Sequence, residues 1–71
     1  MSTLLSNEEK TGIINQHLKN LQYSKFNVEL AIIEENAKAT PDADTLASVN
    51  AQLADIESRI EALEAELDKL A

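Results

Sequence analysis

The chain has 71 residues, no cysteine and a formal net charge of −7 at pH 7. This length allows one small domain, and the lack of cysteine excludes disulfides and thiolate metal sites. Because nucleic acids and anionic membranes are bound by clusters of Lys and Arg, the acidic balance argues against both as partners.

The chain begins with a predicted short tail and a long helix. Residues 1–6 are predicted to be a flexible tail. Ser6 and Glu9 fit a capping box, in which each side chain binds the backbone N–H of the other residue. From there the sequence favours helix to about residue 38, with no proline to interrupt it. Gly12 has a low helix propensity, which predicts that the first turns fray.

Thr40-Pro41-Asp42 predicts the end of one helix and the start of another. Proline disfavours helical geometry in the residue before it, which ends the first helix. Pro41 also suits the first position of a new helix, with Thr40 as its N-cap and Asp42 and Asp44 near the positive end of the helix dipole. We therefore expect a turn over residues 39–41 and a second helix over about 41–70. So short a connection forces the helices to run antiparallel.

Apolar residues recur every three or four positions along both helices and form a row that we call the seam. In the second helix the seam comprises Leu46, Val49, Leu53, Ile56, Ile60, Leu63, Leu67 and Leu70. In the first it comprises Ile14, Leu18, Leu21, Val28 and Ile32, with the polar residues Thr11, Lys25 and Glu35 at positions opposite Leu70, Ile56 and Leu46. The residue numbers of opposite members add to a constant, which is typical of two antiparallel helices packed layer on layer. The sequence therefore predicts an all-α fold, an antiparallel two-helix coiled-coil hairpin that forms a single domain over residues 7–71.

Two charged contacts are expected beside the seam. Lys25 can lay its methylenes over the seam and direct its ammonium to Asp55. His17 flanks the seam near Glu66. Exposed ion pairs contribute little to stability, so these contacts would favour one orientation of the helices more than they stabilise the fold.

Each helix also carries a second stripe, rotated away from the seam. We hypothesise that residues of these stripes form a protein interface comprising Tyr23, Phe26, Leu30, Ile33, Ala37, Ala47, Ala51 and Ala54. Exposed apolar patches usually mark an interface, and large residues beside small ones let another helix approach closely. The expected product is a homo-oligomer, a four-helix or larger bundle, with a dimer favoured because two-fold closure is the commonest symmetry. The alternative is that alanine simply favours helix and that scattered exposed apolar residues are normal.

No residue pattern indicates catalysis or ligand binding. His17 and Ser24 lie one heptad apart, about 10 Å along a helix, which is beyond hydrogen-bond reach. Asp42-Ala43-Asp44 lacks the glycine and the final acid of a calcium loop, and there is no glycine-rich phosphate loop. We therefore expect no catalytic residue, no cofactor, no metal site and no small-molecule substrate, and hence no enzyme.

Two functions stay open. The first is a structural or assembly module that associates with itself. The second is a small adaptor or regulator whose second stripe docks an amphipathic helix of a different protein. The chain has neither an apolar run of about 18 residues nor a leader-like N-terminus, and in outline it resembles short coiled-coil proteins of bacteria and their phages. We therefore expect a cytoplasmic protein, or a virion-associated one if a phage encodes it.

Overall fold

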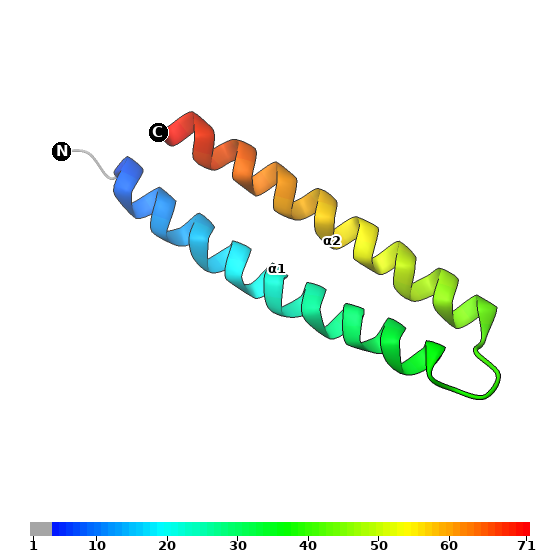
Figure 1. Cartoon of the computed structure of the whole chain (residues 1–71). Coiled ribbons are helices and arrows are strands. Elements are labelled where there is room, and N and C mark those ends of the chain that lie inside the picture. Colours follow the sequence, from blue (N-terminus) through cyan, green and yellow to red (C-terminus); the bar gives the residue numbers. More distant parts are fainter. Residues whose placement is uncertain (1–3) are drawn as a thin grey trace.

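The computed structural model describes residues 4–71, which form two helices lying side by side (Figure 1). Helix α1 spans Asn7–Asn36, helix α2 spans Ala43–Leu70, and residues 37–42 join them. The start of α1 and the end of α2 lie at the same end of the molecule, so the helices run antiparallel. This confirms the predicted all-α helical hairpin. Residues 1–3 of the predicted tail lie outside the described residues.

The seam holds the two helices together. Within residues 4–71 every seam residue is buried or half-buried, and outside the seam only Glu29 and Ala31 reach the same degree of burial. The structure thus confirms which face of each helix is turned toward the other. Leu18 is the one buried apolar residue of this range, with 8% of its surface exposed. The seam of α2 is half-buried throughout, because a single neighbouring helix cannot enclose it.

The molecule is a rod. It measures 63 × 18 × 14 Å, with a radius of gyration of 16.9 Å, against about 11 Å for a compact domain of this length. Its accessible surface is 5415 Å², whereas a compact monomer of this mass exposes about 4,400 Å². In the described part of the chain, neither helix is long and apolar enough to cross a membrane. Within residues 4–71 the hairpin therefore has one packed interface and no enclosed core.

The predicted capping box starts α1. The Glu9 backbone N–H donates to Ser6 Oγ at 3.1 Å, and the Ser6 backbone N–H donates to Glu9 Oε1 at 3.0 Å. These bonds satisfy two of the donors that a helix start leaves unpaired. The helix then continues through Gly12.

The turn is longer than predicted. Helix α1 ends at Asn36 and α2 begins at Ala43, so Thr40 and Pro41 lie in the connection and not at the start of α2. Asp42 is the N-cap of α2, and its Oδ1 accepts a hydrogen bond from the Asp44 backbone N–H at 2.9 Å. The prediction that Thr40 is the N-cap of the second helix was therefore wrong. The physical reason is that aspartate caps a helix better than threonine does.

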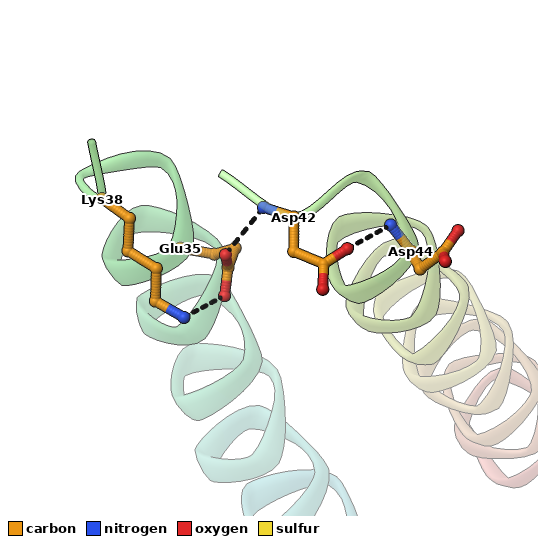
Figure 2. Close-up of polar contacts among 4 residues, drawn as sticks. All are labelled: Glu35, Lys38, Asp42 and Asp44. Carbon is orange, nitrogen blue, oxygen red and sulfur yellow. Dashed lines mark hydrogen bonds and ion pairs between the residues drawn. The ribbon is translucent and has the colours of Figure 1, made fainter. Parts of the chain in front are cut away.

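A buried carboxylate fixes this turn. Glu35 is 6% exposed, and its Oε2 accepts a hydrogen bond from the Asp42 backbone N–H at 2.9 Å. Its Oε1 accepts a hydrogen bond from Lys38 Nζ, also at 2.9 Å (Figure 2). Glu35 is buried at its predicted seam position opposite Leu46, and its carboxylate binds the connection. One side chain of α1 thus holds the residue that caps α2.

Candidate interaction surface

The outer side of α1 carries four large apolar residues that the hairpin does not use. Tyr23, Phe26 and Ile33 are 62%, 60% and 63% exposed, and Leu30 is 39% exposed. Together with the exposed Ala37 they form what we call the large outer stripe. Its members recur every three or four residues, so they lie in one row along the helix.

Helix geometry explains why this stripe is exposed. At 3.6 residues per turn, a residue two positions from a seam residue points to the opposite side of the helix. Tyr23 lies two positions from both Leu21 and Lys25, so α2 cannot cover it. Phe26 comes directly after the seam residue Lys25, so it leans from the outer side toward one flank of the hairpin.

The outer side of α2 carries small residues. Ala47, Ala51, Ala54 and Ser58 are all exposed and recur every three or four positions, and we call them the small outer stripe. The exposed Ala62 and Ala65 continue this row of small residues toward the open end of α2. Ala47 and Ala54 each follow a seam residue directly, so they lean to the same flank of the hairpin as Phe26 does. The hairpin itself does not bring the two stripes together, because each lies on the side of its helix that faces away from the other helix.

The two stripes lie at the same height on the rod. The large outer stripe covers the half of α1 next to the turn, and the small outer stripe covers the half of α2 next to the turn. In Figure 1 these halves are the green end of α1 and the green to yellow part of α2. All eight residues predicted for the interface are therefore exposed and belong to the turn-proximal half of the molecule.

Lys19 borders the large outer stripe. Together with Gln22, Tyr23 and Phe26 it lines a shallow depression of about 300 Å³ on the surface of α1. Within residues 4–71 neither Lys19 nor the acidic residue Glu61 on α2 takes part in an ion pair. Both side chains are exposed.

The charged contacts beside the seam differ from those predicted. Lys25 Nζ lies 3.6 Å from Glu57 Oε2, while Asp55 pairs with Arg59 of its own helix at 3.0 Å. Glu57 and Asp55 are two positions apart on α2, so they project from different sides of the helix, and the ammonium of Lys25 reaches only one of them. The prediction that Lys25 contacts Asp55 was therefore wrong.

His17 lies in a groove between the helices. It lines a space of about 390 Å³ together with Asn20, Leu21, Arg59, Ala62 and Leu63. Glu66, its predicted neighbour, accepts a hydrogen bond from Lys69 at 2.9 Å. In residues 4–71 no three His, Cys, Asp or Glu side chains are grouped to hold a metal ion.

The electrostatics of the turn come from Glu35. The hydrogen bond from the Asp42 backbone N–H and then that from Lys38 lower the pKa of the Glu35 carboxyl from its ordinary value of 4.5. The hydrogen bond between Lys38 and Glu35 in turn raises the pKa of the Lys38 ammonium. Sequence reasoning missed this role, although an acid one turn before a short connection is a signal that could have suggested it.

Comparison with protein-family models, curated proteins and solved structures found no match for this chain. The two outer stripes are therefore interpreted from their geometry alone.

Proposed function

We propose that this protein is a non-enzymatic assembly module whose hairpins associate with one another through their outer stripes. The observation that carries the proposal is the large outer stripe, in which Tyr23, Phe26 and Ile33 are each at least 60% exposed. A contiguous row of large apolar side chains in water is costly, and such rows usually mark interfaces. Their regular spacing makes another helix the natural partner.

The shape of the hairpin supports the same proposal. A rod with one half-buried seam gains less from burial than a compact domain of equal length. Association adds buried apolar area without adding chain to be ordered, so it stabilises small helical scaffolds. The stripes lie outside the seam and stay available for this contact.

Sedimentation equilibrium across micromolar concentrations tests the proposal. The wild-type chain, whose monomer has a mass of 7.8 kDa, should sediment as an assembly of several copies. The variant Phe26→Lys with Ile33→Lys, which we call the large-face variant, should lose this association. Asn20→Lys with Asn27→Lys is its control, because it adds the same charge to exposed polar positions of α1 outside the stripe.

A folded wild-type monomer at every concentration would overturn self-assembly. The vacant large outer stripe would then favour the second candidate function, an adaptor that docks an amphipathic helix of a different protein.

A further inference from the structure

Resting on the proposed function, we infer that the large outer stripe of one copy packs against the small outer stripe of a second copy. The turns of the two hairpins then lie at the same end. Helix α1 of one hairpin thus lies against α2 of the next.

Height along the rod supports this pairing. Both stripes occupy the turn-proximal half of the hairpin. If neighbouring hairpins point the same way, the two stripes overlap along their whole length. If they point in opposite ways with their ends aligned, the large outer stripe meets the open end of α2, where the outer row continues as Glu61, Ala65 and Asp68. The first arrangement therefore places more small residues and fewer acids against the large outer stripe.

Side-chain size supports it as well. Packing of two helices places the side chains of one into the gaps between those of the other, and small residues let the helices approach closely. The large outer stripe supplies Tyr, Phe, Leu and Ile, and the small outer stripe supplies Ala and Ser. Large side chains of α1 can therefore fill the space that the small side chains of α2 leave open.

Charge distinguishes this contact from its main competitor. Lys19 continues the large outer stripe toward the open end, and Glu61 continues the small one at nearly the same height. Neither of them is in an ion pair within residues 4–71. The inferred contact brings this lysine and this glutamate together and sets Glu29 against the neutral Asn50. The competing contact, α1 against α1 of a second copy in antiparallel orientation, brings the Glu29 residues of both copies together. Like charges placed opposite each other are unfavourable, so charge favours the contact between α1 and α2.

The geometry also determines how the assembly grows. The two stripes lie on different helices but lean to the same flank of the hairpin, and each contact uses the large outer stripe of one copy and the small outer stripe of the other. Contacts between two different surfaces form rings when the rotation between copies closes and open filaments when it does not. Two copies that make both contacts at once therefore form a closed dimer, the stoichiometry that the sequence favours, and copies that make one contact each with two neighbours form a larger ring or a filament.

A mixing experiment tests the inference. The large-face variant keeps its small outer stripe, and a small-face variant, Ala47→Lys with Ala54→Lys, keeps its large one. Both carry the same added charge. Each variant alone should sediment as a monomer, because its remaining stripe has no counterpart. An equimolar mixture should form a one-to-one complex that grows no further, since the two remaining stripes are complementary and the blocked faces repel each other.

Three results separate the inference from the proposed function. A small-face variant that assembles as the wild type does would overturn the inference and indicate contact between two α1 helices, while self-assembly would stand. A wild-type assembly whose two variants fail to combine would also overturn it. A wild-type monomer would instead overturn the proposed function.

Reversal of single charges gives a test that does not depend on whether the large-face and small-face variants fold. Lys19→Glu alone, or Glu61→Lys alone, should weaken wild-type association about two- to fivefold. The double reversal should restore it, because it rebuilds the pair with opposite signs. Circular dichroism controls for helicity in every sample. Independent, additive effects of the two reversals would contradict the inferred contact.

Discussion

At the scale of single residues, the buried acid Glu35 binds the turn that joins the two helices. A buried charge is costly unless hydrogen bonds satisfy it. Both oxygens of Glu35 are occupied, one by the Asp42 backbone N–H and the other by the Lys38 ammonium. The first of these donors belongs to the N-cap of α2, so the charge of Glu35 contributes to the geometry of the turn.

The low pKa of the Glu35 carboxyl makes stability depend on pH. Because the pKa is lower in the folded state than in the unfolded chain, the charged carboxylate stabilises the fold above about pH 4.5. This contribution is lost as the pH falls through the folded-state pKa. We expect Glu35→Gln to lower the Tm by several degrees at pH 7 and by progressively less as the pH falls below 4.5, as followed by circular dichroism.

The control for this prediction is Glu34→Gln, which removes the same charge from an exposed neighbour. Protonation of the many other acids shifts the Tm of wild type and variants alike. The relevant quantity is therefore the difference in Tm between wild type and Glu35→Gln. A difference that stays constant between pH 7 and pH 3 would show that the carboxylate charge does not hold the turn.

At the scale of the elements, sequence predicted the two helices better than it predicted their connection. The seam repeats over the whole length of both helices, so many residues agree on one face and one register. The ends of the helices depend instead on competition among a few neighbours. Thr40, Pro41 and Asp42 all carry helix-start signals, and periodicity does not decide among them. The capping box of Ser6 had no such competitor and was predicted correctly.

Single substitutions at the turn can distinguish the two candidate N-caps. Asp42→Ala should lower the Tm by several degrees, because it removes the acceptor of the Asp44 backbone N–H. Thr40→Ala should leave the Tm almost unchanged, because Thr40 lies in the connection. Thermal unfolding monitored by circular dichroism measures both effects. If Thr40→Ala were the more damaging of the two, α2 would begin at Pro41 after all.

The candidate surface was predictable only in part. The exposure of Tyr23 and Phe26 follows from helical geometry once the seam is known. The partner of Lys25 was not predictable, since its long side chain can reach several acids and the choice of Glu57 depends on rotamers. What covers the large outer stripe depends on a second molecule, about which the periodicity of one chain carries only indirect information.

At the scale of the whole molecule, the hairpin lacks the enclosed interior that stabilises most domains. Within residues 4–71 only Leu18 and Glu35 are buried. Burial therefore contributes little free energy per residue, while the entropy cost of ordering each residue is undiminished. A molecule of this kind should draw a large part of its stability from association, and folding and assembly should then occur together.

Coupling of folding to assembly predicts that thermal stability rises with protein concentration. Association that involves only the folded state shifts unfolding by mass action, so a tenfold increase in concentration should raise the Tm on the order of 5 °C for a chain of this size. Circular dichroism in cells of different path length can follow unfolding from low to high micromolar concentration. The large-face variant should show a lower Tm that does not change with concentration, whereas Asn20→Lys with Asn27→Lys should behave as the wild type does. A wild-type Tm independent of concentration would mean that the half-buried seam stabilises the hairpin on its own, and the outer stripes would then contribute nothing to its folding.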